Sequence, residues 1–446
     1  MRILHYSLGF PPYRTGGLTK FCMDLMKQQI KSGHEVALLW PGQMGFVFHN
    51  VTIRDDGVEH YGDAMIRSFE VINPLPISYD EGIREFDKFI YQGDEKPFQT
   101  FLDKYKPDVI HIHTLMGLHT AFLKVAKEKS IKLIFTAHDF FPICPKVTMF
   151  RHNQICDSIE NCNACGVCNA TALSIKTIKI LQSPIYRKLK DITLVRMLRK
   201  QHRDEYLSEK TAEMGEYSVG TSEDFKRLRT HYHEMIMCMD IIHYNSSVTK
   251  AVYEKYFGKL TSIVIPISHA NIADHRKIKS FSNEKLRIRY LGPCAYGKGF
   301  FCLKAALDKL WNERQDFSLD VQFVPPEISP YIKSHGRYNY SELDRIFDET
   351  DVLVAPSIWY ETFGYTVLEA LSYGVPVIIT ETVGAKDILV DGAGIVIDDA
   401  KSDQLFNAIK GLNADMLHSM NKVIVDNQSI LTIKEMSDMI EAKCYR

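Results

Sequence analysis

Two glutamates eight residues apart flank a glycine turn in the segment SIWYETFGYTVLEALSYGVP at 357–376. The preceding run DVLVAPS suits a buried parallel strand, and the residues after ETFG favour a helix that ends at Gly374. A helix that follows a parallel strand presents unpaired N–H groups and the positive end of its dipole, which suits a diphosphate without a metal. Glu361 and Glu369 could then accept hydrogen bonds from vicinal sugar hydroxyls, so the segment predicts a site for a nucleotide sugar.

This segment resembles the Glu-x7-Glu signature of the retaining glycosyltransferases of family four, which have the GT-B fold, and the likeness runs over most of the chain. The resemblance implies that Glu361 contacts the donor sugar and that Glu369 contacts the ribose of the nucleotide. It also implies that the helix starting after Phe363, with Gly364 at its entrance, stabilises the diphosphate. The alternative interpretation is that the two glutamates belong to a solvated helix face.

The first loop of the chain carries a second candidate site. Gly16 and Gly17 directly precede an expected helix, so the backbone can approach an anionic group and offer N–H donors. The resemblance places such a pair against phosphate and acceptor, whereas a plain turn would also explain two adjacent glycines.

A His-Asp pair ends the predicted strand IKLIFTAH. By the resemblance, His138 hydrogen-bonds the transferred sugar and helps to position it, and Asp139 supports the loop or the acceptor; a core histidine is the alternative. His111 and His113 alternate along another strand, so they point to one face. A metal pair is one interpretation of these two, and packed, hydrogen-bonded histidines are the one we favour.

The segment YLGPCAYGKG at 290–299 resembles the family's strand-end glycine, here Gly292, followed by Lys-Gly. Lys298 is therefore the expected cation for the diphosphate, where negative charge develops as the bond breaks. The family usually carries an arginine just after that glycine, and this chain has Pro293. Either another cation such as Arg337 covers that oxygen, or the leaving group is stabilised less.

Five cysteines follow the His-Asp pair within residues 144–168. Their number and Cys-x2-Cys spacing fit a closed tetrahedral zinc site; an iron–sulfur cluster, disulfides and free thiols are the alternatives. A structural zinc would hold the acceptor-side loop and take no part in the chemistry. Resemblance to a subset of family-four enzymes implies as ligands Cys144, Cys156, Cys162 and Cys165, with Cys168 as a substitute.

A basic stretch follows the cysteines. Residues 176–203 contain nine Lys or Arg against one Asp, interleaved with apolar residues and Tyr. Such a stretch can lie on an anionic membrane surface, which would suit a lipid-linked acceptor. A solvated helical face is the alternative.

Composition limits the class of protein. The chain has 446 residues, 45% of them hydrophobic and 24% charged, which is ordinary for a globular protein of two or more domains. A net charge of −1 gives no overall attraction to nucleic acid or membrane. The chain has no long apolar run, and it starts with a predicted strand rather than a signal peptide, so we expect a cytoplasmic protein, in peripheral contact with the inner face of the membrane if the basic stretch binds there.

Strand and helix patterns alternate in two similar halves, one from RILHYS at 2–7 and one from KLRIRYLG at 285–292. The predicted fold is therefore α/β of the GT-B type, with two Rossmann-like doubly wound domains facing a central cleft. The expected division is an acceptor-side domain at 1–272 with a Cys-rich, basic insert at about 142–235, a nucleotide-sugar domain at 273–424, and a helix at 425–446 that by resemblance crosses back.

With these patterns, the resemblance implies a retaining enzyme that moves a hexose from a UDP- or GDP-sugar to a glycan or lipid-linked oligosaccharide. The resemblance implies that the acceptor attacks from the leaving group's own face and that surface polysaccharide assembly is the pathway. We expect no cofactor for catalysis and no nucleic-acid partner. The rivals are a nucleotide-sugar epimerase of the same architecture and a non-catalytic sugar-binding partner subunit.

Overall fold

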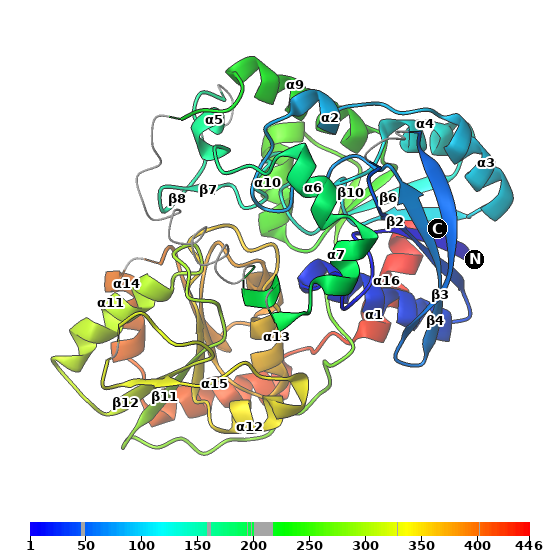
Figure 1. Ribbon diagram of the computed structural model, residues 1–446. Helices are drawn as coiled ribbons and strands as arrows, with labels where there is room; N and C mark the ends of the chain where they lie inside the picture. The colour runs from blue at the N-terminus through cyan, green and yellow to red at the C-terminus, as the bar shows by residue number, and fades with distance from the viewer. Residues whose placement is uncertain are drawn as a thin grey trace.

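The computed structural model describes residues 1–45, 50–157, 162–193, 195–197, 199, 217–327, 329–400 and 402–446. The chain forms two large β-sheets, each flanked by helices and each built from its own half of the sequence (Figure 1). The predicted α/β architecture of two Rossmann-like, doubly wound domains is confirmed.

The first sheet has eight strands in the order β10-β9-β6-β5-β1-β2-β4-β3. Neighbouring strands pair in parallel, except that β3 and β4 form an antiparallel hairpin at one edge. The sequence does not predict this hairpin, because β3 is polar and almost wholly exposed. The strands are β1 (Arg2–Tyr6), β2 (Glu35–Pro41), β3 (Thr52–Tyr61), β4 (Ala64–Ile72), β5 (Val109–Ile112), β6 (Lys132–Ala137), β9 (Ile241–Tyr244) and β10 (Ser262–Val264).

The second sheet has six strands in the order β13-β12-β11-β14-β15-β16, and all of its pairs are parallel. A short separate hairpin joins β7 (Phe150–Arg151) and β8 (Gln154–Ile155) in the Cys-rich segment. The strands of the second sheet are β11 (Leu286–Tyr290), β12 (Phe317–Val321), β13 (Ile332–Ser334), β14 (Val352–Ala355), β15 (Val377–Thr380) and β16 (Gly394–Ile397).

Helices connect the parallel strands. In the first half they are α1 (Gly17–Lys31), α2 (Phe86–Phe89), α3 (Lys96–Tyr105), α4 (Thr120–Glu128), α5 (Cys165–Cys168), α6 (Ile175–Leu181), α7 (Pro184–Leu189), α9 (Ser222–Met237) and α10 (Ser247–Phe257). In the second half they are α11 (Phe300–Trp311), α12 (Leu343–Asp348), α13 (Tyr365–Ser372), α14 (Ser402–Lys410), α15 (Ala414–Asn427) and α16 (Ile433–Ile440). Shorter turns are η1 (Tyr340–Glu342), η2 (Gly384–Ile388) and η3 (Glu441–Tyr445).

One apolar cluster joins the two halves. It combines Ile3 and Phe21 of the first half with Phe363 and Val367 at the start of α13. The buried residues of α16 complete this cluster, and α16 packs against α1 beside the first sheet (Figure 1). The C-terminal helix α16 therefore contacts the first domain through α1 and shares an apolar cluster with α13.

The basic stretch at 176–203 lies only partly within the described residues, which cover it up to residue 193 and then at 195–197 and 199. Within them, α6 and α7 form two short consecutive helices. Both start at a serine whose side chain accepts a hydrogen bond from a backbone N–H of the first turn. None of the described helices combines the length and apolarity needed to cross a bilayer.

Candidate active site

A glycine-lysine-glycine turn positions Lys298 after β11. Gly299 has a φ of +74°, and a Cβ there would lie 1.7 Å from the carbonyl oxygen of Pro356. A Cβ on Gly297 would lie 2.2 Å from the Trp359 ring, and the Gly297 carbonyl accepts hydrogen bonds from the N–H groups of Ile358 and Trp359. Glycine on both sides of Lys298 therefore lets this turn pack directly on the loop that follows β14.

The packing brings Lys298 into an ion pair with Glu361, although 63 residues separate them. Both side chains remain partly exposed, at 25% for Lys298 and 22% for Glu361. Trp359 adds a third contact, because its Nε1 lies 3.4 Å from Glu361 Oε2 and its ring centre lies 5.4 Å from Lys298 Nζ. The ammonium of Lys298 and the carboxylate of Glu361 are thus in contact and partly accessible to solvent, in the loops that follow the neighbouring parallel strands β11 and β14.

The start of α13 lies directly beyond this pair. Gly364 caps the helix with a φ of +107°, and Gly374, with a φ of +75°, follows its end. The side chain of Phe363 is only 2% exposed and packs in the shared apolar cluster. Of the two residues predicted to bind the diphosphate here, Phe363 can therefore offer only its backbone.

Glu369 has different surroundings from Glu361. Its carboxylate is buried, with Oε1 3.1 Å from Nε2 of His269. Its other oxygen, Oε2, and the hydroxyl of Tyr365 one turn earlier are both buried and have no hydrogen-bond partner in the described structure. A buried acceptor and a buried hydroxyl without partners on one helix face indicate a place where a polar ligand could bind.

Pro293 occupies the position of the family's arginine. Its carbonyl accepts a hydrogen bond from Tyr290 at 2.8 Å, and the same tyrosine hydroxyl would lie 2.5 Å from a Cβ on Gly292. Arg337 is exposed on the loop before η1. Burial, and secondly the charge of Glu369, raise the pKa of Tyr338 in the same loop and of Tyr340 at the start of η1, so both phenols lie near Glu369.

The first domain faces this site with two of its predicted residues. Gly16 caps α1 with a φ of +110°, and a Cβ on Gly17 would lie 3.7 Å from the Tyr365 ring. The backbone carbonyl of His138 accepts a hydrogen bond from the Thr362 hydroxyl at 3.1 Å. Gly17 and His138 are thereby brought to the α13 side of the second domain.

The ring of His138 contacts another histidine of the first domain. Its Nε2 lies 3.2 Å from Nδ1 of His113, and burial lowers the pKa of His138 to about 3, so the ring is neutral near pH 7. Asp139 Oδ1 accepts a hydrogen bond from the Phe141 N–H at 2.9 Å, and burial raises the pKa of this carboxyl to about 6. Asp139 thus stabilises the turn that carries His138.

His111 and His113 are buried, and each of their four ring nitrogens has a hydrogen-bond partner in the protein. Within the described ranges, three potential metal ligands come within 4.8 Å of one another only at His5, His111 and His113. Because their nitrogens already bind one another and neighbouring polar groups, the packed and hydrogen-bonded interpretation accounts for this cluster.

Two of the five cysteines contact Arg229. Its guanidinium donates to Cys162 Sγ at 2.7 Å and to Cys165 Sγ at 3.2 Å. Burial and the sulfur of Cys168 raise the pKa of Cys144 to about 12, and burial raises that of Cys165 to about 11. The nearby β7–β8 hairpin places Phe150 edge-on to Trp359, with ring centres 5.8 Å apart, so the Cys-rich segment reaches the Lys298–Glu361 pair.

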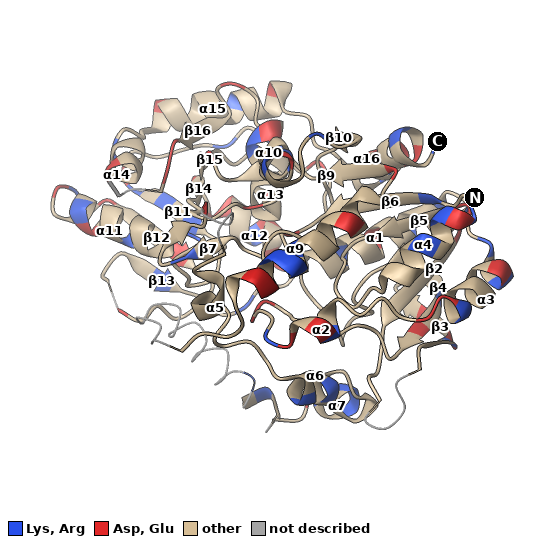
Figure 2. Ribbon diagram, turned by 90° about the horizontal axis from the view of Figure 1, so that it is seen from above, with Lys and Arg blue, Asp and Glu red and all other residues tan. Residues whose placement is uncertain are grey.

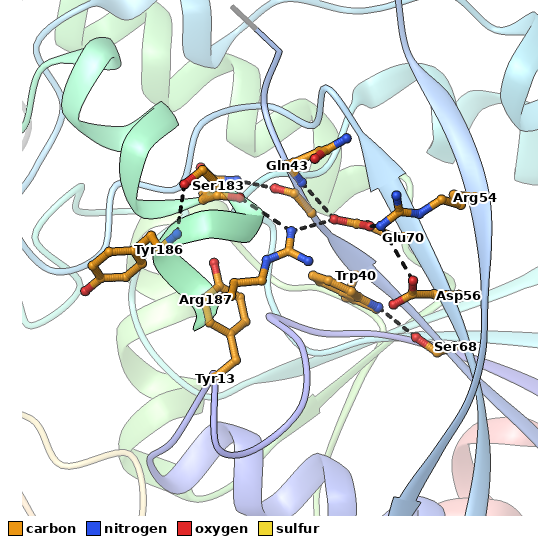
Figure 3. A network of polar contacts seen from close by, with 12 residues as sticks. Tyr13, Trp40, Gln43, Arg54, Asp56, Ser68, Glu70, Ser183, Tyr186 and Arg187 are labelled. Atoms are coloured by element: carbon orange, nitrogen blue, oxygen red, sulfur yellow. Dashed lines mark hydrogen bonds and ion pairs between the residues drawn. The ribbon is translucent and has the colours of Figure 1, made fainter. Parts of the chain in front are cut away.

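Helix α7 is fixed to the first domain by Arg187 (Figure 3). Arg187 and Arg54 both form ion pairs with Glu70, whose carboxylate is fully buried and also accepts the Gln43 N–H. The Arg187 guanidinium lies 4.6 Å from the centre of the Trp40 ring. These contacts hold the basic helices next to the loop before Gly16.

Tyr13 and Lys190 complete the connection between α6, α7 and that loop. The Tyr13 hydroxyl donates to the carbonyl of Leu181 at 3.3 Å, and Lys190 donates to the carbonyl of Pro12. The loop that carries the glycine pair is therefore packed against both basic helices.

Lys20 and His269 also reach the site, and sequence reasoning missed both. Lys20 Nζ lies 2.8 Å from Asn271 Oδ1 and 4.7 Å from the centre of the Tyr340 ring, so α1 contacts the second domain. The sequence signal for Lys20 was weak, a lysine in the first turn after the glycine pair, and His269 had no signal, since it lies just before the expected domain boundary at 272/273.

Two family models match separate parts of this chain. Residues 15–155 match the family model "Glycosyltransferase Family 4" and residues 327–427 match "Glycosyl transferases group 1". An uncharacterized 42.6 kDa protein from the cps region of Klebsiella pneumoniae is 21% identical over 86% of each chain. D-inositol 3-phosphate glycosyltransferase from an Arthrobacter species is 30% identical over 23% of this chain and 24% of its own length.

Solved structures share the fold over nearly the whole chain. A sucrose-phosphate synthase from Thermosynechococcus elongatus aligns with a TM-score of 0.59, 13% identity, and coverage of 99% of this chain and 97% of its own. Anabaena HepE in complex with UDP-glucose aligns with a TM-score of 0.54, 12% identity, and coverage of 99% and 100%. Together with the fold, the two family matches indicate that this chain is a GT-B protein of the glycosyltransferase type, similar to family 4.

Proposed function

We propose that this protein is a retaining glycosyltransferase that moves a hexose from a nucleotide diphosphate sugar to a glycan or lipid-linked acceptor. The observation that carries the proposal is the meeting of Lys298 and Glu361 beside the start of α13. Ligands of open α/β sheets bind at the carboxyl ends of the strands, and these two side chains lie at the ends of β11 and β14. The positive charge of Lys298 suits the diphosphate of the donor, and the carboxylate of Glu361 suits the hydroxyls of its sugar.

Each group then has a role. On donor binding, Lys298 would leave Glu361 for the diphosphate, where it and the N–H groups at the start of α13 stabilise the negative charge of the leaving group. Glu361 would accept hydrogen bonds from hydroxyls of the sugar. The acceptor oxygen bonds to the anomeric carbon as the carbon–phosphate-oxygen bond breaks, and the acceptor's proton passes to a phosphate oxygen on the same face.

The unpaired groups on α13 support a ribose position. Glu369 Oε2 and the Tyr365 hydroxyl are buried without partners, and ribose hydroxyls can both donate and accept. Arg337 is our proposed substitute for the missing arginine, because its loop already approaches Glu369 through Tyr338 and Tyr340. The relative from a cps region supports a role in surface polysaccharide assembly, and the UDP-glucose complex of HepE supports UDP as the nucleotide.

The test starts from a thermal-shift screen of UDP- and GDP-sugars, because a bound donor stabilises the native state. With the donor so found, Glu361→Gln and Lys298→Ala should each lower kcat by about 100-fold or more, since each removes a charge placed for the transition state. Lys386→Ala is the matched control, because Lys386 pairs with Glu381 on a neighbouring loop. Unchanged transfer in both site variants would refute the assignment.

The same assay separates the rival functions. A transferase turns over the donor slowly without an acceptor and rapidly with one. An epimerase would convert the donor to its epimer without any acceptor, and a non-catalytic partner subunit would bind the donor without turnover. The anomeric configuration of the product, compared with that of the donor, tests retention.

We also propose a structural zinc at Cys144, Cys156, Cys162 and Cys165, with Cys168 as a substitute. The clustered sulfurs and the guanidinium bound to two of them support the donor set. Tetrahedral zinc needs sulfurs about 4 Å apart, so binding would draw these side chains closer than they lie here. Metal analysis should give one zinc per chain, lost in Cys144→Ser and Cys162→Ser and retained in Cys302→Ser; a zinc-free protein would exclude it.

We propose further that α6 and α7 contact an anionic membrane surface. Figure 2 shows Lys and Arg gathered on these helices, and Ile180, Ile185 and Leu189 are 55%, 70% and 43% exposed beside them. Basic and apolar side chains on one surface favour anionic lipid. Ile185→Asp should abolish salt-sensitive binding to vesicles containing phosphatidylglycerol, whereas Val324→Asp, at another exposed apolar residue, should not. Equal binding to neutral vesicles would contradict the proposal.

A further inference from the structure

A continuous chain of buried polar side chains runs beneath His138 through the first domain. It connects five histidines, which lie in or directly after neighbouring parallel strands, with one residue each from α1, β6 and η3. We call it the histidine chain; its members, in order of contact, are His243, Thr136, His111, Tyr445, Gln29, His5, His113 and His138.

The direction of the hydrogen bonds is fixed at one end by a backbone carbonyl. His243 Nε2 lies 2.8 Å from the carbonyl oxygen of Ile265, which can only accept, so Nε2 carries the proton. In a neutral imidazole Nδ1 must then accept, and its partner at 2.9 Å is the hydroxyl of Thr136. Since Thr136 has only one proton to donate, its oxygen accepts from His111 Nε2 at 2.6 Å.

The hydrogen bonds keep the same donor-to-acceptor direction through Tyr445 of the C-terminal segment. His111 Nδ1 has no proton and accepts from the Tyr445 hydroxyl at 2.7 Å. The tyrosine oxygen then accepts from Gln29 Nε2 at 2.9 Å, and Gln29 Oε1 accepts from His5 Nε2 at 2.7 Å. The orientation of the Gln29 amide, nitrogen toward Tyr445 and oxygen toward His5, is the one that this direction requires.

The direction ends at His138. His5 Nδ1 accepts from His113 Nε2 at 2.9 Å, and His113 Nδ1 accepts from His138 Nε2 at 3.2 Å. The proton of His138 therefore lies on Nε2, where it bonds to His113, and the lone pair lies on Nδ1. Burial lowers the pKa of His138 to about 3 and those of His5 and His243 to about 4, so these rings are neutral near pH 7.

We propose that the histidine chain sets the tautomer of His138, so that Nδ1 is presented as a hydrogen-bond acceptor to a substrate hydroxyl. Thr136 and Tyr445 act as positioning residues in this arrangement. The substrate half of the inference rests on the proposed glycosyl transfer, whereas the tautomer belongs to the free protein. Tyr445 near the C-terminus therefore influences His138 through the bond of its hydroxyl to His111, although 334 residues separate Tyr445 from His111.

A reversed chain would present a proton on His138 Nδ1 instead. It would require the Gln29 amide to turn over and the Thr136 proton to point at His111, which leaves His243 Nδ1 without a donor. A buried acceptor without a donor is unfavourable, so Thr136 and the Ile265 carbonyl together select the first direction. Removing either the Thr136 or the Tyr445 hydroxyl would remove that selection at His138.

The test is the tautomer of His138 in ligand-free protein, measured by long-range proton–nitrogen NMR with nitrogen-15 histidine, the signal being assigned by its loss in His138→Gln. The wild type should show the Nε2–H form. Thr136→Val and Tyr445→Phe should each give a mixture of Nε2–H and Nδ1–H forms, whereas Thr136→Ser, which keeps the hydroxyl, should preserve the wild-type signal.

Transfer kinetics add a second readout. The same two variants should lower kcat several-fold while Thr136→Ser stays near wild type, and thermal unfolding of each variant shows whether the fold is kept. An Nδ1–H form or a charged ring in the wild type, or an unchanged His138 signal in both variants, would overturn the proposal. A correct tautomer in a protein without transfer activity would instead refute only the proposed function.

Discussion

Two glutamates with one spacing motif have unequal surroundings in the folded chain. Glu361 is partly exposed and pairs with Lys298, 63 residues away, whereas Glu369 is buried against His269, 100 residues away. The spacing could be recognised in the sequence because it lies within one segment. The partners could not, because they reach the segment only through folding. Lys298 had a local signal in its flanking glycines, and His269 had none.

The unpaired hydroxyl of Tyr365 gives a prediction at this scale. Tyr365→Phe removes a buried hydroxyl that has no partner in the free protein, so the stability of the free protein should be unchanged or slightly higher. If the hydroxyl binds the nucleotide, KM for the donor should rise by about tenfold, the loss of one hydrogen bond. Steady-state kinetics and thermal unfolding measure the two effects.

Tyr91→Phe is the control, because that side chain is 61% exposed on the surface of the first domain. A donor KM equal to the wild-type value in Tyr365→Phe would place the nucleotide away from α13.

At the scale of elements, helices and buried parallel strands followed their sequence patterns closely. The strand expected in DVLVAPS is β14 at Val352–Ala355, and the helix expected after ETFG is α13 at Tyr365–Ser372, which ends just before Gly374. Apolar runs and glycine stops are local signals, so they can be read from the chain. The β3–β4 hairpin could not, because its outer strand is exposed and carries no apolar alternation.

A prediction for the secondary-structure elements concerns the glycine turn after β11. Gly299→Ala would place a Cβ against the Pro356 carbonyl in a backbone conformation with φ of +74°, so the turn must move away from the β14 loop. We expect destabilisation of about 2 kcal/mol or more and loss of the Lys298–Glu361 contact, with donor binding lost as well. Chemical denaturation and donor titration measure both.

Gly336→Ala is the matched glycine substitution, because a Cβ there meets nothing within 4 Å. Near-wild-type stability of Gly299→Ala with normal donor binding would show that the turn does not need its glycine.

In the whole molecule, the two domains are held together by contacts between residues from distant segments, which the sequence of one segment does not reveal. Two similar halves could be predicted from alternating strands and helices, but the apolar cluster of α13, α16 and the first sheet could not. The histidine chain is another case, because its members come from β1, β5, β6, β9, α1 and the last turn of the protein. Only the fold assembles them.

That chain predicts acid sensitivity of the whole protein. Burial lowers the pKa of His5, His138 and His243 from 6.5 to about 4, 3 and 4, and it lowers the pKa of His111 and His113 well below 6.5. Below pH 6.5 the unfolded chain therefore binds protons that the folded protein does not, so stability should fall as the pH drops toward 4. Each histidine that stays neutral in the folded protein adds to this loss of stability.

The pKa shift of Asp139 has the opposite effect on stability in acid, but it concerns only one group. Burial raises its pKa from 3.8 to about 6, so acid favours the folded form at this residue and offsets one histidine. Thermal unfolding midpoints should change little between pH 8 and 7 and fall steeply between pH 6.5 and 5. A midpoint constant down to pH 5 would show that these histidines are not buried as neutral groups.

The position of UDP or GDP in a crystal of the protein tests the central claim most directly. The diphosphate should lie within hydrogen-bond distance of Lys298 Nζ and the first turn of α13, the ribose should lie at Glu369, and Lys298 should be separated from Glu361. A nucleotide bound anywhere else, or one bound there with the Lys298–Glu361 pair intact, would contradict it.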